Sequence, residues 1–254
     1  SVGVIPAKGY KVLWFDHNEA DPRQIDFKLD CDGGTFYIAD ENGNLVTLQS
    51  YPAAISRTSY ARTTDGANNW GLTALPTPGK SNDGSVFATA RLDAPIINKD
   101  SQLFTSSFIA RVTIPDGATL KYTTDGTTPS ATNGQVSTTG RFTVNTTTTY
   151  RFRLFQDGML PSEVITRSYI YKDKEFKLPV ISVVTDPVNL YDDSLGVYVK
   201  GVNGRPGNGQ STPCNWNMEW DRPVNFEYIT PDGKMAFNQE VDFAMCGGWS
   251  RAWL

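Results

Sequence analysis

The chain has 254 residues, of which 39% are hydrophobic and 20% are charged, and its formal net charge at pH 7 is −4. This proportion of apolar residues, with so little net charge, excludes an intrinsically disordered chain. A general nucleic-acid binder is also excluded, because such proteins need surplus lysine and arginine to neutralise phosphates.

Alternating apolar and polar residues predict β-strands along most of the chain, and no window shows a sustained helical period. The clearest predicted strands are residues 35–39, 119–124, 149–155, 164–171, 178–184 and 222–229. Glycine-containing turns separate them at residues 32–34, 41–44, 125–126, 157–158 and 231–233. One short helix is predicted where Asp186 acts as N-cap and Pro187 opens a turn that runs to Tyr191. The expected fold class is therefore all-β or mainly β.

Two breaks in the pattern divide the chain. Residues 75–84 are rich in proline and glycine and cannot lie inside a central strand. Residues 171–177 form a charged run between two predicted strands. We therefore predict three domains, at residues 1–80, 81–175 and 176–254.

The first segment carries three short motifs in order: Ser59-Tyr-Ala-Arg62, Asn69-Trp70 and Pro76-Thr-Pro-Gly79. In this order and spacing they resemble the second half of a lamin-tail domain, an immunoglobulin-like β-sandwich found in many bacterial surface proteins. The opening strands of that family have no counterpart here. The resemblance therefore implies a partial sandwich with an exposed edge that can pair with another chain.

The middle segment contains the string Tyr122-Thr-Thr-Asp-Gly-Thr-Thr-Pro129, followed by Thr148-Thr-Tyr-Arg-Phe-Arg153 and Asp157-Gly158. It resembles the chitobiase/β-hexosaminidase C-terminal type of domain, for which the first string is typical. The resemblance implies a complete, small immunoglobulin- or fibronectin-like sandwich that is an accessory module without chemistry of its own.

The last segment contains Leu178-Pro-Val-Ile-Ser182, Trp220-Asp-Arg-Pro-Val224 and Gly247-Gly-Trp-Ser-Arg251. It resembles the start of a CotH-type domain, of the spore-coat protein H family, although glutamate is more usual where Asp221 stands. Some members of that family have an atypical protein-kinase fold. Their nucleotide- and metal-binding carboxylates belong to a part that would follow Leu254, so no kinase residue is carried over, and we expect a β-rich partial domain with a short helix.

Catalytic constellations are weak in this sequence. Residues 201–209 are glycine-rich, but Pro206 interrupts them and no helical run follows, so a mobile surface loop is expected rather than a phosphate cradle. The single histidine, His17, lies in a polar turn and no Gly-x-Ser-x-Gly motif accompanies it, so a nucleophilic triad is not expected. We predict no catalytic residue in this chain.

Sugar binding by a β-sandwich relies on exposed aromatic rings with polar neighbours, whereas tryptophan in a sandwich is more often part of the core. Trp216 beside the glycine-rich loop is the best candidate for an exposed platform. Trp220, flanked by Glu219 and Asp221 on one side of a strand, is a second acidic and aromatic group, although an ion pair with Arg222 is the alternative for the carboxylates. The candidate ligand-binding residues are Trp216, Trp220, Glu219 and Asp221.

No cofactor is predicted, with one alternative left open. Oxygen ligands could hold Ca²⁺ where acidic residues cluster near the start of the chain, although no spacing matches a known calcium loop. These residues are Asp16, Glu19, Asp21, Asp26, Asp30 and Asp32. The sequence also leaves open whether Cys214 and Cys246 form a disulfide, because spacing alone cannot show that they meet.

These observations predict a non-catalytic fragment of a secreted bacterial cell-surface protein, located outside the cell, on its surface or in the periplasm. Its modules are expected to act in adhesion or as spacers and to bind glycans or envelope proteins, with no nucleic acid as partner. The longest apolar stretch, residues 179–184, is too short to span a membrane. The alternative is an accessory part of an enzyme, either a CotH-type atypical kinase or a chitobiase-like glycoside hydrolase, with the catalytic residues outside this chain.

Overall fold

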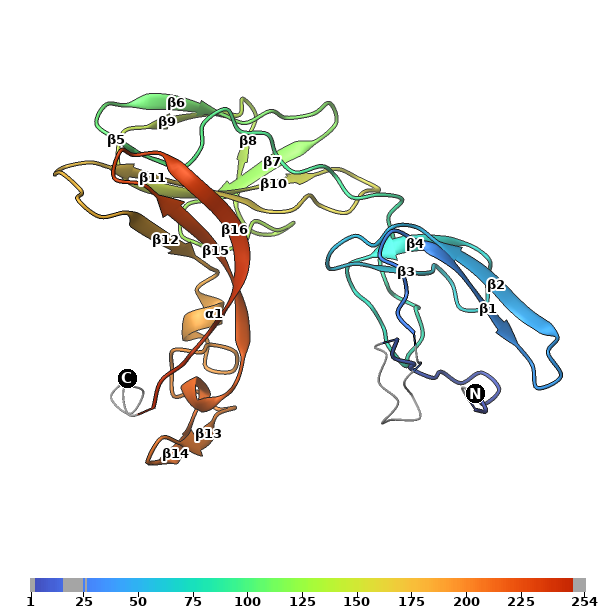
Figure 1. Cartoon of the computed structure of the whole chain (residues 1–254). Coiled ribbons are helices and arrows are strands. Elements are labelled where there is room, and N and C mark those ends of the chain that lie inside the picture. Colours follow the sequence, from blue (N-terminus) through green and yellow to red (C-terminus); the bar gives the residue numbers. More distant parts are fainter. Residues whose placement is uncertain (1–2, 16–24, 26, 249–254) are drawn as a thin grey trace. The chain divides into compact units, whose positions relative to one another are not determined.

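A computed structural model describes residues 3–15, 25 and 27–248 of the chain (Figure 1). The fold is mainly β, with 40% of residues in strands and 3% in helices, which confirms the predicted fold class. Contacts divide the chain into two compact units, one of residues 1–91 with 157–160 and the other of residues 92–156 with 161–254. The predicted boundary near residue 175 falls inside the second unit, and the division into three domains stays a prediction.

The first unit contains two antiparallel hairpins. β1 (Gly34–Ala39) pairs with β2 (Leu45–Tyr51), and β3 (Ser59–Arg62) pairs with β4 (Trp70–Thr73). The predicted turn at residues 41–44 joins the first pair, and the Asp40 carboxylate accepts hydrogen bonds from the backbone N–H groups of Asn42 and Asn44. A small core is formed by Leu72 of β4 with Ala88 and Leu160.

The second unit is built around a five-stranded sheet in the order β5–β11–β10–β7–β8, with a separate β6–β9 pair. The strands are β5 (Gln102–Phe104), β6 (Phe108–Arg111), β7 (Thr119–Thr123), β8 (Gln135–Ser137), β9 (Arg141–Val144), β10 (Thr148–Phe155) and β11 (Ile165–Tyr171). Tyr150, Phe152 and Leu154 alternate along β10 and are buried, since every second side chain of a strand points to the same face. They form a core with Leu120 of β7 and Phe142 of β9, whose ring centroid lies 5.0 Å from that of Phe152.

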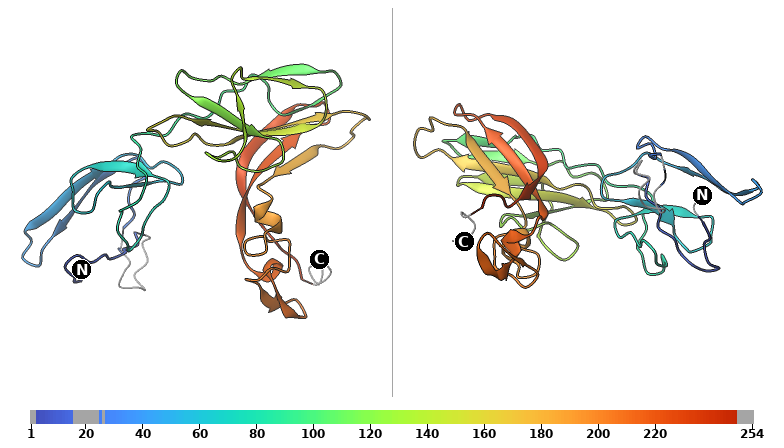
Figure 2. Two further views of the ribbon diagram at one scale, coloured as in Figure 1. Left: turned by 180° about the vertical axis from the view of Figure 1, so that it is seen from behind. Right: turned by 60° about the horizontal axis from the view of Figure 1, so that its bottom comes forward.

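A three-stranded antiparallel sheet follows in the same unit (Figures 1 and 2). Its strands are β12 (Val180–Val184), β15 (Asp221–Ile229) and β16 (Met235–Ala244). Between β12 and β15 lie helix α1 (Val188–Tyr191), strands β13 (Arg205–Gly207) and β14 (Gln210–Cys214) and the short 3-10 helix η1 (Asn215–Asn217).

The predicted helix is confirmed with a small difference at its start. Pro187 is the residue that precedes the helix rather than its first helical residue. Asp186 is therefore not the N-cap, as predicted, but lies one residue before it, and its Oδ1 accepts a hydrogen bond from the Val188 backbone N–H at 3.2 Å.

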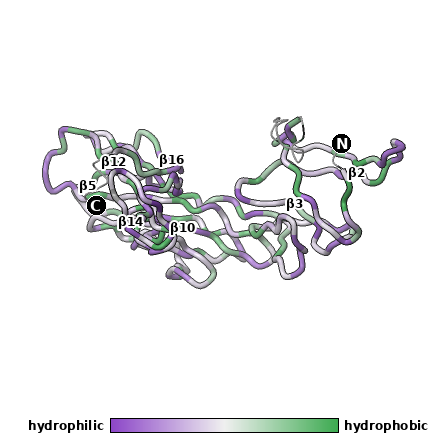
Figure 3. The backbone as a smooth tube through the Cα atoms, turned by 90° about the horizontal axis from the view of Figure 1, so that it is seen from below, coloured by the Kyte–Doolittle hydropathy of each residue, from purple (hydrophilic) through white to green (hydrophobic). Residues whose placement is uncertain are grey.

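Hydrophobic and hydrophilic residues intermingle along the strands of both units (Figure 3). Such mixing is typical of sheets with one buried and one solvated or polar face. Within the part of the chain that the structure describes, no helix has the length and apolar character needed to cross a membrane.

Two tyrosines of the second unit are expected to ionise at a higher pH than an exposed tyrosine. Tyr169 is fully buried and its hydroxyl donates a hydrogen bond to the Lys99 carbonyl at 2.9 Å. Burial raises the pKa of Tyr169 and of Tyr150 above the usual 10.0, because an apolar environment disfavours the phenolate. The folded-state pKa values lie above the unfolded ones. The contribution of these two neutral hydroxyl groups to the free energy of unfolding is therefore fully present below about pH 10 and is lost as the pH rises further.

We therefore expect that part of the tyrosine absorbance change in an alkaline titration appears only together with unfolding. Tyr150→Phe and Tyr169→Phe should each reduce the part of the tyrosine absorbance change that accompanies unfolding. Ionisation of both residues near pH 10, in a chain whose far-ultraviolet circular dichroism is unchanged, would contradict this account.

Candidate functional site

The interface between the two sheets of the second unit is polar. On β10 and β11, Thr149 lies opposite Ser168 and Arg151 opposite Thr166. These side chains occupy the face of the sheet away from the Phe152 core, because they alternate with the core residues. Ser168 Oγ lies 2.8 Å from Ser182 Oγ of β12, so a hydrogen bond joins the two sheets.

Glu227 is the central residue of this interface and is completely buried. Its Oε1 accepts hydrogen bonds from Ser101 Oγ and, at 2.7 Å, from Asn238 Nδ2. Asn238 Nδ2 also donates to the Thr166 carbonyl at 3.0 Å, and Ser101 Oγ accepts from the Ser168 backbone N–H at 2.9 Å. Glu227 Oε2 has no hydrogen-bond partner. A buried carboxylate thus connects strands of both sheets, and one of its two oxygens accepts no hydrogen bond.

A cavity of about 180 Å³ lies beside this network. It is lined by residues of β10, β11, β15, β16 and the segment before β11, which include Arg151, Glu163, Thr166, Asn225, Asn238 and Glu240. Three buried donors in this lining, Arg151 Nε, Arg167 Nε and Asn225 Nδ2, have no hydrogen-bond partner. These residues were not predicted from the sequence, because their strands are far apart along the chain and only the packing of the sheets brings them together.

Arg151 also holds the turn that is typical of the middle segment. Its Nη1 donates to the Gly126 carbonyl at 2.8 Å and to Thr128 Oγ1 at 3.0 Å. Burial lowers the pKa of Arg151, while the carboxylates of Asp186 and Glu240 act in the opposite direction. Asp186 Oδ2 accepts from the Thr128 backbone N–H at 2.8 Å, so the turn is anchored from two sides.

The turn itself is shaped by its aspartate and glycine. Asp125 Oδ1 accepts hydrogen bonds from the Thr127 backbone N–H at 3.0 Å and from its hydroxyl at 2.6 Å. These bonds hold the pKa of the Asp125 carboxyl below its usual value. Gly126 adopts a φ of 84°, which favours glycine. The string at residues 122–129 is therefore the end of β7 followed by a fixed loop that presents polar groups to Arg151 and Asp186.

Trp216 is not the exposed platform that we predicted. It lies in η1 between Asn215 and Asn217, and only 2% of its surface is accessible. The faces of its ring are therefore not available for stacking on a sugar. A residue in this environment is part of a core, which was the alternative interpretation of tryptophan in a β-rich chain.

The glycine-rich stretch packs against the residues on either side of this tryptophan. Residues 205–207 form β13 and pair with β14, so the expected mobile loop is in part a hairpin. A Cβ atom at Gly204 would lie 2.1 Å from the backbone carbon of Cys214, and one at Gly201 would lie 2.0 Å from Asn215 Nδ2. Close packing thus explains these glycines.

The other candidate ligand-binding residues lie near the surface. Glu219 pairs with Arg205 at 2.9 Å, and both side chains are more than half exposed. The guanidinium of Arg222 instead stacks over Trp220, 4.8 Å from the ring centroid, and donates to the Leu195 carbonyl. Asp221 is exposed at the start of β15. Whether Glu219, Trp220 and Asp221 bind a ligand stays a prediction.

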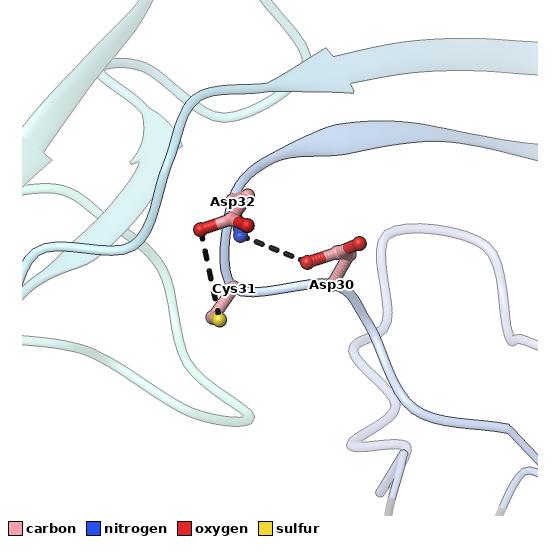
Figure 4. A group of neighbouring side chains, drawn as sticks. All are labelled: Asp30, Cys31 and Asp32. Atoms are coloured by element: carbon pink, nitrogen blue, oxygen red, sulfur yellow. Dashed lines mark hydrogen bonds between the residues drawn. The ribbon is translucent and has the colours of Figure 1, made fainter.

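Asp30, Cys31 and Asp32 bring three possible metal-ligand atoms to within 4.8 Å of one another (Figure 4). All three residues are exposed, and the Asp32 backbone N–H donates to Asp30 Oδ1 at 2.9 Å. Exposed acidic groups commonly gather without an ion, so Ca²⁺ binding here stays a prediction. Five residues named in the sequence-based predictions lie outside the described residues: the remaining acidic residues of the cluster, Asp16, Glu19, Asp21 and Asp26, and the single histidine, His17.

All three cysteines are free, so Cys214 and Cys246 are not bridged in this structure.

Residues 101–166, from β5 to the first residues of β11, match the family model of the chitobiase/beta-hexosaminidase C-terminal domain. This stretch is a chitobiase/beta-hexosaminidase C-terminal domain. Domains of this type are immunoglobulin-like accessory modules of bacterial glycosidases. The resemblance predicted for the middle segment is confirmed over these residues, while the lamin-tail and CotH resemblances stay predictions. No curated protein matches the chain.

Proposed function

We propose that this chain is a non-catalytic part of a secreted bacterial cell-surface protein, whose modules act in adhesion or as spacers and bind glycans or envelope proteins. The observation that carries the proposal is the accessory domain at residues 101–166, one face of which packs through a polar interface against the sheet that follows it. Hydrogen bonds and a buried carboxylate across an interface restrict the relative orientation of its two layers. A restricted orientation suits a module that holds a binding surface in place.

The purified chain is expected to bind glycans or bacterial envelope material and to catalyse no reaction on them. Binding is measured on a glycan array and with isolated envelope fractions. Catalysis is measured with a chromogenic N-acetylglucosaminide and with labelled ATP in the presence of Mg²⁺. Hydrolysis or phosphate transfer in proportion to the amount of chain would contradict the non-catalytic function.

The second candidate is an accessory part of an enzyme, either a chitobiase-like glycoside hydrolase or a CotH-type kinase. The family of residues 101–166 favours it, because that family is named after glycosidases. A longer natural product that contains this chain and its flanking segments would separate the two candidates. Hydrolysis of chitin oligosaccharides or phosphorylation of a protein by that product, and by no part of residues 1–254, would support the enzyme-associated role.

A further inference from the structure

We propose that the first unit binds an extended segment of a partner protein, which adds as a strand to the free edge of β1. The segment is apolar at alternate positions and basic at both ends. The inference rests on the proposed function, in which the chain binds envelope proteins, and it names the site and the chemistry of the partner. In strand addition, backbone hydrogen bonds supply affinity and contacts of alternate side chains supply specificity.

One edge of β1 is free. The other edge pairs with β2 over Gly34–Ala39, and within the described residues no backbone hydrogen bond joins β1 to any other segment. β1 contains no charged residue and no proline, which commonly protect an exposed edge from pairing. A two-stranded ribbon is only marginally stable by itself, so a third strand on this edge would stabilise it.

A cavity of about 510 Å³ lies along this free edge. It is lined by the four consecutive residues 36–39 of β1 and by no residue of β2. Consecutive side chains of a strand point to opposite faces, so a cavity that all four residues reach borders the edge of the strand. The opposite wall is formed by residues that are two apart in the sequence: Lys11, Leu13 and Phe15, and Ile25, Phe27 and Leu29.

This wall is accessible to a ligand. Phe27 is 52% exposed and Leu29 is 40% exposed, and the ring centroids of Phe15 and Phe27 lie 5.3 Å apart. The Ile25 backbone N–H donates to the Trp14 carbonyl at 2.7 Å, so the two segments of the wall lie side by side. Residues two apart in an extended segment face the same side, and a strand added to β1 would place every second side chain against them.

The chemistry of the cavity favours a peptide over an acyl chain or a sugar. An acyl chain would cover the N–H and C=O groups of the β1 edge without bonding to them, which costs free energy. A sugar would find few polar side chains, because Lys11 and Tyr37 are the only polar ones among the residues that line the cavity. An extended backbone pairs with the edge and also presents apolar side chains to the wall.

The charges near β1 indicate the ends of the partner segment. Four of the five charged residues between positions 27 and 41 are acids, and the fifth is Lys28. Asp30 and Asp32 precede β1, Asp40 and Glu41 follow it, and all four are exposed. A segment with lysine or arginine at both ends complements these acids.

A second copy of this chain fits the edge less well. Two β1 strands paired antiparallel about their midpoint would place Glu41 of each copy opposite Asp32 of the other. Like charges directly opposite each other destabilise a strand pair. The partner is therefore a different protein.

Fluorescence anisotropy of the labelled peptide Lys-Val-Thr-Val-Thr-Val-Lys with the whole chain tests the proposal. We expect saturable binding, and roughly tenfold weaker binding of Glu-Val-Thr-Val-Thr-Val-Glu, whose ends repel the acids, and of Lys-Val-Thr-Pro-Thr-Val-Lys, whose proline disfavours a strand. Hydrogen exchange at the amides of residues 34–39 should slow when the first peptide binds, because a strand on the free edge protects them.

Variants of the wall test where the peptide lies. Phe27→Ala and Leu29→Ala should each weaken binding of the first peptide by roughly tenfold, because each removes apolar contact area. Leu48→Ala is the matched control and should bind as the unchanged chain does, since Leu48 is 59% exposed on β2 and does not line the cavity. Glu41→Gln should weaken binding and make it less sensitive to salt.

The outcomes separate this site from the proposed function. Envelope proteins retained equally by the unchanged chain and by Phe27→Ala, with no binding of the peptide, would overturn the site and leave the proposed function. Peptide binding with slower exchange at residues 34–39, by a chain that retains no envelope protein, would support the site and contradict the proposed function. Equal binding of the proline-containing peptide would overturn strand addition. A dimer of the chain that the peptide dissociates would overturn the assignment to a different protein.

Discussion

Replacement of Glu227 by alanine is expected to lower the free energy of unfolding of the second unit by roughly 2–5 kcal/mol. The carboxylate is completely buried and accepts hydrogen bonds from Ser101 and Asn238. Its removal leaves the Ser101 hydroxyl and one N–H of the Asn238 amide without an acceptor at the interface of the two sheets, while Asn238 Nδ2 keeps its bond to the Thr166 carbonyl. The change is measured as a shift of the urea midpoint, monitored by circular dichroism and tryptophan fluorescence.

Glu227→Gln is the matched control for this prediction. The glutamine keeps an oxygen acceptor for Ser101 and Asn238, and it replaces the unpartnered Oε2 with a neutral group. We therefore expect Glu227→Gln to lie within about 1 kcal/mol of the unchanged chain. Glu219→Ala, which removes an exposed carboxylate paired with Arg205, should cost less than about 1 kcal/mol. Equal losses for Glu227→Ala and Glu219→Ala would contradict the role of Glu227 in joining the sheets.

Trp216→Ala is expected to destabilise the segment around β13 and β14 by about 3–5 kcal/mol, because it removes a large buried side chain and leaves a cavity. Only 2% of the Trp216 surface is accessible. The expected result is a lower unfolding temperature and early proteolysis within residues 196–218, measured by limited trypsin digestion and mass spectrometry.

Trp220→Ala provides the comparison for Trp216. Trp220 is half-buried and packs against the Arg222 guanidinium rather than inside the core. Its replacement should cost clearly less than that of Trp216. Unchanged stability of Trp216→Ala together with a loss of glycan binding would contradict the core role of Trp216.

The strands and the helix were largely predictable because their signals are local. The alternation in residues 149–155 identified β10, and the Asp186-Pro187 pair identified the start of α1. The typical string at residues 122–129 identified the accessory domain, which the family match confirms over residues 101–166. Each of these signals lies within a few consecutive residues, and the geometry that it encodes is decided by those same residues.

The candidate site was not predictable in the same way. Glu227 lies on one face of β15 with Ile229, which is buried, so alternation alone places a glutamate where an apolar residue is expected. The sequence therefore contained a signal for a buried glutamate. That signal does not identify the residues that donate hydrogen bonds to the carboxylate. Trp216 shows the converse case, since a tryptophan beside a polar, glycine-rich stretch suggested exposure, whereas the structure buries it and the glycines pack closely against its neighbours Cys214 and Asn215.

The amino-acid pattern by itself determined the fold class, the positions of most strands and turns and the accessory domain of the middle segment. Only the tertiary structure decided which faces of the strands meet, and with them the polar interface, the burial of Glu227 and Trp216 and the cavity at Arg151 and Asn225. The physical reason is that strand formation and turn geometry depend on neighbouring residues. Burial and hydrogen-bond satisfaction depend instead on residues such as Ser101 and Glu227, which are distant in the sequence and meet only when the two sheets pack.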